Sequence, residues 1–379
     1  MVSNREPAEI LEDAYQQAKK RRERSFITDQ EIRSRIAAVS RSRIGAGVRL
    51  ILACSLAKVH DPSIDIRKPY TELEGNSYSG RTYDEQYVTE FVNRYELPCN
   101  PTTAFLTPAL RTKNVILEPG INLGGRDKGL YHDAILLLND VENGRIKAED
   151  LLKETVRNLL ELKRIRSQRI SSLLDELKQT EGITPLSAED IVNLIEQHFK
   201  SPNASRLPVL VVAAAYKAAS DNLGERALPL QAHTAADKRT GALGDIEIAL
   251  VDDNEIVTAY EMKMKKITKD DIDRALQKLR NFGGHIDNYI FVTTDVIDLD
   301  VAEYARSLYR ETAGIEFVIL DCIGFLRHFL HLFHRLRLEF LECYQELLLD
   351  EPESAVRQPL KESFLALRQA AESSYSQGS

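Results

Sequence analysis

The chain has 379 residues, of which 43% are hydrophobic and 28% are charged, and its formal net charge is −8. This length is sufficient for two or three domains with sizeable cores. No stretch approaches the roughly 18 uncharged apolar residues of a membrane span, and the first residues lack an apolar signal core. The four cysteines show no CxxC spacing, which favours reduced thiols in a cytoplasmic protein over a disulfide framework or a zinc site.

Residues 1–200 are predicted to be mainly helical. Helices are expected over Val48–Val59, Thr82–Tyr95 and Ala148–Gln179. The third fits either a coiled-coil or dimer contact, or packing inside a helical subdomain. The second has an aromatic residue at every fourth position, which is more typical of a core face than of a base-stacking platform: Tyr83, Tyr87, Phe91 and Tyr95.

Two further features of this region bear on binding. Basic residues cluster over residues 19–24, and this pattern fits a solvated helical face or a contact with phosphates equally well. Residues 97–130 form a proline-containing, loop-rich stretch, and loops of this length are often functional. The glycines of residues 124–129 lack the spacing of a phosphate-binding P-loop, so we interpret that segment as a turn or as part of a binding surface.

Strands and helices alternate after residue 205. Hydrophobic alternation predicts strands, and helical spacing with capping residues such as Thr268 predicts helices. The expected elements in chain order are a helix over Val209–Ser220, strands over Ala242–Leu250 and Ile256–Met264, a helix over Lys269–Phe282, a strand over Asn288–Thr293, a helix over Val301–Thr312 and a strand over Ile315–Leu320. This order indicates an α/β (α+β) mixed sheet flanked by helices.

The two predicted adjacent strands carry a constellation of charges that suits metal-assisted chemistry. Glu261 and Lys263 point to the same face because side chains alternate along a strand. If Asp245 lies on the neighbouring strand, its carboxylate joins them. Carboxylate oxygens suit Mg²⁺, and a nearby lysine can orient an attacking water, so the three residues are candidates for hydrolysis of a phosphodiester.

The order of elements and the pattern GD…ExK resemble the PD-(D/E)xK nuclease superfamily over roughly residues 205–325. Residues 77–85, continuing to 97–108, and residues 233–250 with the following ExK strand are similar to restriction endonucleases of the SacI family. Gly244 stands where the superfamily usually has a proline, and glycine there would still permit close approach of the backbone to a phosphate.

The resemblance implies a role for each matching residue. Asp245, Glu261 and the Met262 carbonyl would hold Mg²⁺, and Lys263 would contact the nucleophilic water or the scissile phosphate. Some superfamily members add an upstream helical glutamate. Glu225 is the candidate for that additional acid, although its neighbours indicate the end of a helix.

The resemblance also implies an activity and partners. It implies a type II restriction endonuclease that cleaves both strands of duplex DNA at a short palindrome, GAGCTC-like in the SacI family. A palindromic target is matched by a homodimer, and a cognate DNA methyltransferase is expected in the host without being a stable subunit. The alternatives are a repair or branched-DNA nuclease with the same core, and a non-catalytic DNA-binding or scaffold protein whose GD…ExK is a decorated hairpin.

The expected organisation has three parts. Residues 1–200 would form a helical region for DNA recognition and dimerisation, residues 201–325 the nuclease core, and residues 326–379 C-terminal helices whose last part is dispensable. The net negative charge does not exclude DNA, since affinity depends on a local basic surface. Polar and basic residues of the loops and helices are candidate DNA contacts, with a solvated surface as the alternative: Lys238, Arg239, Arg81, Asn100, Thr102, Thr103, Arg111, Lys113, Arg274 and Lys278.

Overall fold

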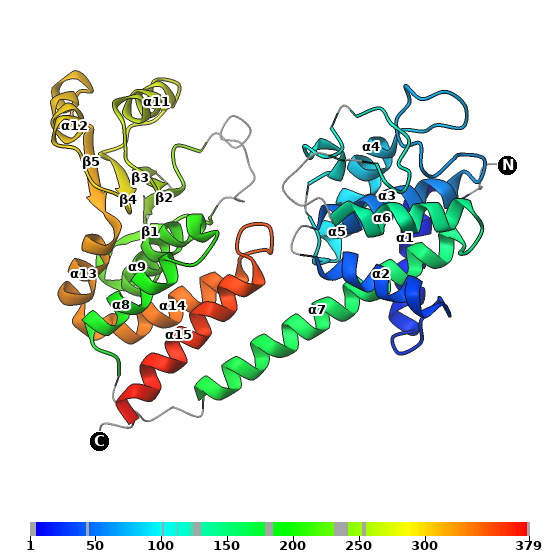
Figure 1. Cartoon of the computed structure of the whole chain (residues 1–379). Helices are drawn as coiled ribbons and strands as arrows, with labels where there is room; N and C mark the ends of the chain where they lie inside the picture. The colour runs from blue at the N-terminus through cyan, green and yellow to red at the C-terminus, as the bar shows by residue number, and fades with distance from the viewer. Residues whose placement is uncertain are drawn as a thin grey trace. The chain divides into compact units, whose positions relative to one another are not determined.

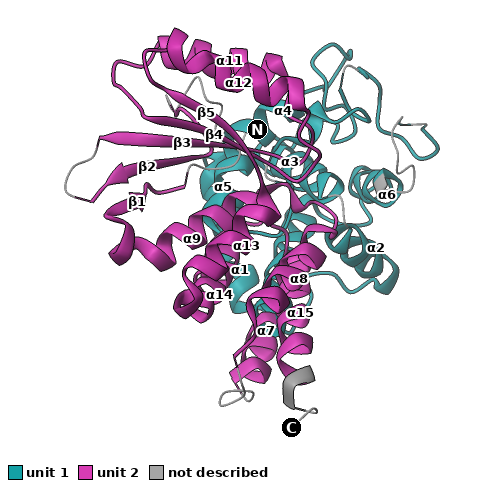
Figure 2. Cartoon of the chain, turned by 90° about the vertical axis from the view of Figure 1, so that its left-hand side faces the viewer, with its two compact units in different colours: residues 1–169 teal, residues 170–379 magenta. Residues whose placement is uncertain are grey.

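The computed structural model describes residues 5–42, 45–100, 102–111, 113–121, 123, 130–178, 185–230, 242–251 and 255–376. The chain divides into two compact units, residues 1–169 and 170–379 (Figure 2). The division differs from the three expected regions, because it falls inside α7 (Ala148–Lys178) and places the C-terminal helices in the same unit as the sheet. None of the described helices is both long and apolar enough to cross a lipid bilayer.

All regular secondary structure among the described residues of the first unit is helical. Its elements, labelled in part in Figure 1, are α1 (Pro7–Lys20), α2 (Gln30–Arg41), α3 (Ala46–His60), α4 (Gly80–Tyr83), the π-helical turn η1 (Asp84–Val88), α5 (Thr89–Arg94), the 3₁₀ turn η2 (Ala104–Leu106), α6 (Leu130–Glu142) and the first part of α7. The predicted helix over Thr82–Tyr95 is therefore three consecutive helical segments with a π-helical turn between α4 and α5.

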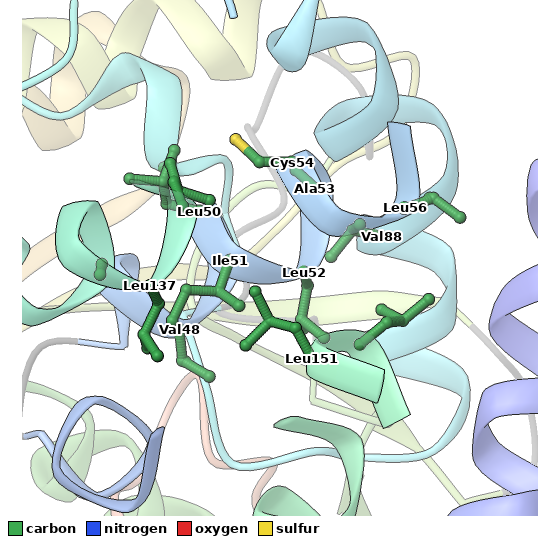
Figure 3. Close-up of a cluster of buried hydrophobic side chains, with 14 of the residues drawn as sticks. Val48, Leu50, Ile51, Leu52, Ala53, Cys54, Leu56, Val88, Leu137 and Leu151 are labelled. Atoms are coloured by element: carbon green, nitrogen blue, oxygen red, sulfur yellow. The ribbon is translucent and has the colours of Figure 1, made fainter. Parts of the chain in front are cut away.

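Helix α3 is the centre of this unit. Every residue from Ala46 to Ala57 is buried, as expected for a helix that is apolar on all faces. Figure 3 shows side chains of α3, such as Ile51 and Leu52, in a cluster with Leu137 of α6 and Leu151 of α7. The aromatic residues at every fourth position pack against the same core, so the prediction that they form a core face is confirmed.

One buried ion pair fixes the loop that follows α5. The side chains of Arg49 and Asp84 are both fully buried, and the Arg49 Nε donates to an Asp84 carboxylate oxygen over 2.5 Å. Arg49 also donates to the Asn100 carbonyl at 2.7 Å. The second Asp84 oxygen accepts hydrogen bonds of 2.7 Å from the Thr103 hydroxyl and from the Ala104 backbone. A buried pair leaves an uncompensated charge when one partner is lost, so this pair ties α3, η1 and residues 100–104 together.

The second unit contains a sheet and its flanking helices. Its elements are the end of α7, α8 (Ala188–Phe199), η3 (Ala204–Arg206), α9 (Leu207–Leu223), β1 (Glu225–Ala227), β2 (Ile246–Leu250), β3 (Ile256–Lys263), α11 (Lys269–Arg280), β4 (Asn288–Thr293), α12 (Leu299–Glu311), β5 (Glu316–Asp321), α13 (Cys322–Leu332), η4 (His334–Leu336), α14 (Arg337–Asp350) and α15 (Gln358–Ser376). The strands lie in the order β1-β2-β3-β4-β5. The first three pair antiparallel and the last three parallel, so the predicted mixed sheet is confirmed.

Helices cover both faces of this sheet. Figure 2 shows α11 and α12 on one face and α9 and α13 on the other. Strand alternation divides the apolar side chains accordingly: Ile246 and Tyr260 join the core on the α9 side, and Ala259 joins the core on the α11 side. Glu261, the neighbour of Tyr260 in β3, therefore belongs to the α11 face, where it contacts Lys278.

Three details differ from the sequence-based expectations. The predicted strand over Ala242–Leu250 begins only at Ile246, and the short strand β1 was not predicted. Helix α15 is not a dispensable tail, because its residues Phe364 and Leu365 are fully buried in the core of the second unit. These side chains would expose a large apolar area if the helix were removed.

Candidate active site

Backbone pairing brings Asp245 next to the ExK strand. Ile246 pairs with Tyr260 in the antiparallel register of β2 and β3, so Asp245, the residue before β2, lies beside the segment of β3 that contains Glu261. The Asp245 backbone N–H donates to the Tyr260 carbonyl at 2.7 Å. Its carboxylate accepts a hydrogen bond of 2.7 Å from the Met262 backbone N–H. The two acidic residues predicted from the sequence therefore come from adjacent backbone segments that are hydrogen-bonded to each other.

Gly244 makes this approach possible. A Cβ at this position would lie 2.3 Å from the Tyr260 carbonyl oxygen and 2.9 Å from its carbon. The close approach is thus to the backbone of β3. The expectation from the sequence, close approach to a phosphate, gave a different reason for the glycine. Residues 242–245 can lie against β3 only because residue 244 has no side chain.

Glu261 is held by three groups. One carboxylate oxygen, Oε1, lies 3.2 Å from the Lys263 ammonium, and the other, Oε2, lies 3.2 Å from the Lys278 ammonium. The Tyr289 hydroxyl donates to the Leu243 carbonyl at 2.8 Å and lies 3.3 Å from the same Oε2. Two cations and a buried tyrosine therefore fix the orientation of this carboxylate.

Lys263 also contacts the start of helix α11. Its ammonium lies 3.4 Å from Asp271, which closes a reciprocal capping box with Thr268. Burial raises the pKa of Asp271. Hydrogen bonds from Thr268 and the charge of Lys263 lower this pKa by a larger amount, so the net change is downward. An ionised Asp271 keeps Lys263 between two carboxylates, those of Glu261 and Asp271.

Asp245 is the acid of the cluster whose pKa is raised. Burial raises its pKa; the hydrogen bond from Met262 lowers it, and the nearby charge of Glu261 raises it again. The charges of Arg206 and Lys278 act in the opposite direction, and the net shift is upward. A half-buried carboxylate beside a second one is an arrangement that a positive ion stabilises.

The Met262 carbonyl lies at the same edge of the strand. Because the N–H and C=O of a strand residue point towards the same neighbour, the bond from the Met262 N–H to Asp245 directs the Met262 carbonyl to that side as well. Two carboxylates and one carbonyl thus gather where β2 has not yet begun and β3 ends. Within the described residues, however, no three His, Cys, Asp or Glu side chains cluster closely enough to form a metal site by themselves.

Lys278 belongs to this cluster, although the sequence suggested a DNA contact for it. Its ammonium also approaches the Leu243 carbonyl at 3.5 Å. The signal was present in the sequence: Lys278 follows Asp271 by seven residues, which places both on one face of a helix. That face packs on β3, and both side chains contact the ExK residues.

Other predicted residues lie elsewhere. Glu225 pairs with Leu250 at the opposite end of β2 from Asp245, so the register does not bring it to the cluster. Arg274 forms an ion pair with Asp271. Lys238 and Arg239 lie outside the described residues.

The candidates of the first unit are held mainly by local contacts. Thr103 is buried and bonded to Asp84, which corrects its interpretation as a DNA contact. Arg81 pairs with Glu85 at 2.7 Å, and the Asn100 side chain accepts from the Thr102 hydroxyl at 3.3 Å. Arg111 is exposed, and Lys113 is half-buried.

Residues 185–294 match the family model of the SacI restriction endonuclease C-terminal domain. The chain resembles the SacI restriction endonucleases. The match runs from the start of α8 to the end of β4 and contains the whole acidic and basic cluster, so the resemblance deduced from the sequence is confirmed for this segment. A restriction endonuclease domain implies a nuclease, which is a hydrolase. A search among curated proteins finds no match.

The role of Gly244 can be tested by adding one methyl group. We expect Gly244→Ala to lower the free energy of unfolding by roughly 1–3 kcal/mol, because the new Cβ overlaps the Tyr260 carbonyl. Gly283→Ala is the matched control, since a Cβ at Gly283 meets nothing within 4 Å. Denaturant unfolding of both variants measures the difference. Equal stability of the two variants would contradict the assigned role.

Proposed function

We propose that the chain is a type II restriction endonuclease that hydrolyses both strands of duplex DNA with Mg²⁺ at a short palindromic site. The observation that carries this proposal is the placement of Asp245, Glu261 and Lys263 close together at adjoining ends of two paired segments. That placement occurs within the segment that matches the SacI family. The fold agrees with the core of the PD-(D/E)xK superfamily, which we propose as the wider family.

The donor set fits Mg²⁺. Mg²⁺ prefers oxygen ligands and is usually held by one or two carboxylates while substrate phosphates and waters complete its shell. Asp245, Glu261 and the Met262 carbonyl supply oxygen only, and Asp245 is a half-buried carboxylate with a raised pKa. When bound, Mg²⁺ would polarise the scissile phosphate and stabilise the charge that develops on it.

The residues of the chain supply the remaining steps. Lys263, held between Glu261 and Asp271, is placed to orient the attacking water and to offset negative charge on the phosphate. Lys278 holds the other oxygen of Glu261 and, with Tyr289, fixes the direction of that carboxylate. Water then attacks phosphorus in line, the bond to the 3′ oxygen breaks, and the product carries a 5′-phosphate.

The proposal extends to specificity and partners. The family match supports a restriction enzyme, and a GAGCTC-like palindrome is the target that SacI kinship suggests. A homodimer would present two such sites to a symmetric duplex. A cognate DNA methyltransferase would protect the host.

A second candidate is a repair or branched-DNA nuclease with the same core, since the match leaves residues 1–184 and 295–379 uncovered. Digestion of a plain plasmid with Mg²⁺ distinguishes the two functions. Discrete fragments with one common end sequence would support the restriction enzyme. Cutting that requires a branch or a lesion would support the second candidate.

Substitution of Lys263 should slow cleavage while leaving DNA binding nearly unchanged. We expect Lys263→Ala to lower the cleavage rate by at least about 10²-fold, because the charge beside the water and phosphate is lost. Its affinity for duplex DNA in EDTA should change less than about threefold. Lys265→Ala is a suitable control, as it removes a neighbouring lysine that is exposed. Undiminished cleavage by Lys263→Ala would remove Lys263 from the site and favour a non-catalytic DNA-binding protein.

Lys278 is a positioning residue whose charge should influence cation binding. Lys278→Met removes the cation that contacts Glu261 Oε2, so the carboxylates should attract Mg²⁺ more strongly. We expect the half-saturating Mg²⁺ concentration for cleavage to fall several-fold, and Lys278→Arg to stay close to the wild type. A Mg²⁺ titration of cleavage at saturating DNA measures this. An unchanged half-saturation in Lys278→Met would refute the electrostatic role.

In the absence of metal, the ionised Asp245 should lower the stability of the folded protein. Its raised pKa means that the folded chain keeps a proton to a higher pH than the unfolded chain, so stability falls as the pH rises from 3.8 through the raised value. Asp245→Asn cannot ionise and should be at least as stable as the wild type at pH 7 without metal, with the difference shrinking in acid.

The same variant should lose the stabilisation by Mg²⁺. Thermal unfolding at pH 7, with EDTA or with Mg²⁺, measures both effects. A variant that is less stable in EDTA and still stabilised by Mg²⁺ would contradict the assignment.

A further inference from the structure

The basic residues at the end of α1 border a hollow in the first unit. This hollow of about 130 Å³ lies between α1 and α7. Its cationic lining consists of Lys19 and Arg22, from the end of α1 and the turn after it, and Arg157 and Arg164 of α7. Among the described residues, Glu161 is the acidic group of the lining. We refer to these residues as the cationic hollow.

The positive charge of the hollow is only partly neutralised. Arg164 pairs with Glu161 at 2.6 Å, and Arg157 pairs with the buried Glu154 at 2.6 Å. In the described part of the chain, the ammonium of Lys19 and the guanidinium of Arg22 form no ion pair. The hydrogen bond from Arg164 lowers the pKa of Glu161; burial raises it, and the charges of Arg164, Arg157 and Arg41 lower it further. The surroundings of Glu161 are therefore net positive.

The hollow has a fixed shape. Arg157 donates to the Arg22 carbonyl at 3.2 Å, which joins the turn after α1 to α7. Tyr15 lines the hollow and stacks on Tyr95 with ring centroids 3.7 Å apart. Ala18 and Leu160 supply an apolar floor. The bond to the Arg22 carbonyl fixes Arg157, so this cation loses less conformational entropy on binding than a flexible one.

The charge of the chain is unevenly distributed. Residues 1–169 contain 28 Lys and Arg against 24 Asp and Glu, a net charge of +4, whereas residues 170–379 contain 22 against 34, a net charge of −12. The unit that contains the acidic cluster would therefore repel a polyanion unless a basic surface elsewhere attracted it. Arginine is well suited to such a surface because its planar guanidinium binds phosphate oxygens in pairs.

We propose that the cationic hollow binds a backbone phosphate of duplex DNA, outside the site of hydrolysis. This inference rests on the proposed function, since it assigns the duplex as the anion. The contact adds affinity without reading sequence, as phosphate contacts do. Lys19 and Arg22 carry it, because their charges are not already neutralised.

The test compares duplex binding by the full chain and by Lys19→Glu/Arg22→Glu. Fluorescence anisotropy with a labelled duplex in EDTA, at several salt concentrations, keeps catalysis out of the measurement. We expect the double variant to bind at least about 10-fold more weakly and the slope of log affinity against log salt to become shallower by about two. With Mg²⁺, its fragments should be those of the wild type.

Lys147→Glu is the control, and it reverses one charge where the double variant reverses two. Lys147 is exposed and precedes α7, so it lies about 25 Å along the helix axis from Arg164. We expect its affinity and salt slope to match the wild type within twofold. An equal loss in this control would overturn the proposal, because net charge alone would then explain the effect. Lys19→Ala/Arg22→Ala gives a milder change should the glutamates disturb α1, and unaltered binding by it would also overturn the proposal.

Three further outcomes are distinguishable. If inorganic phosphate stabilises the wild type but not the double variant, and duplex affinity is equal in both, the hollow holds a free anion and the proposal fails. A wild-type chain that binds duplex with the predicted salt slope but never cleaves it would refute the nuclease function and leave the hollow as a DNA contact. Absence of duplex binding by the wild type would refute the proposal that the cationic hollow binds DNA.

Discussion

The structure around the active-site candidate depends on keeping two carboxylates close together at one end of a strand pair. Asp245 precedes β2 and is bonded to the Met262 backbone of β3, next to Glu261, and it is half-buried. Like charges in such a place repel strongly. The chain offsets the repulsion with Lys263 and Lys278, whose ammonium groups bind Glu261 from two sides. Under the proposed function, a bound divalent cation would offset the same repulsion.

Much of this arrangement could be predicted from the sequence because it depends on short-range rules. The alternation of side chains placed Glu261 and Lys263 on one face, and the capping pattern at Thr268 located the start of α11. Contacts that depend on the tertiary fold could not be found in this way. The pairing of β1, which carries Glu225 away from the cluster, and the approach of Gly244 to the Tyr260 carbonyl are set by the sheet as a whole.

The first unit shows the same limit more clearly. Its helices were predictable from periodicity, but Arg49 and Asp84 are separated by 35 residues and meet only in the folded core. Asp84 of this pair binds the Thr103 hydroxyl, so Thr103 is not a DNA contact. Arg49 binds the Asn100 carbonyl and holds the segment from residue 100 in place. The family match does not extend to this unit. We therefore base the proposed DNA contact of the first unit on the basic residues that line the cationic hollow between α1 and α7.

The central claim is that the oxygens of Asp245 and Glu261 share one divalent cation. A crystal structure of the full chain with duplex DNA and Mn²⁺, which gives an anomalous signal that Mg²⁺ lacks, tests it most directly. The account predicts one strong peak about 2.1 Å from a carboxylate oxygen of each residue and next to a phosphate of the duplex. A structure in which DNA and Mn²⁺ are both bound, while these two carboxylates contact only lysines and the metal lies elsewhere, would contradict it.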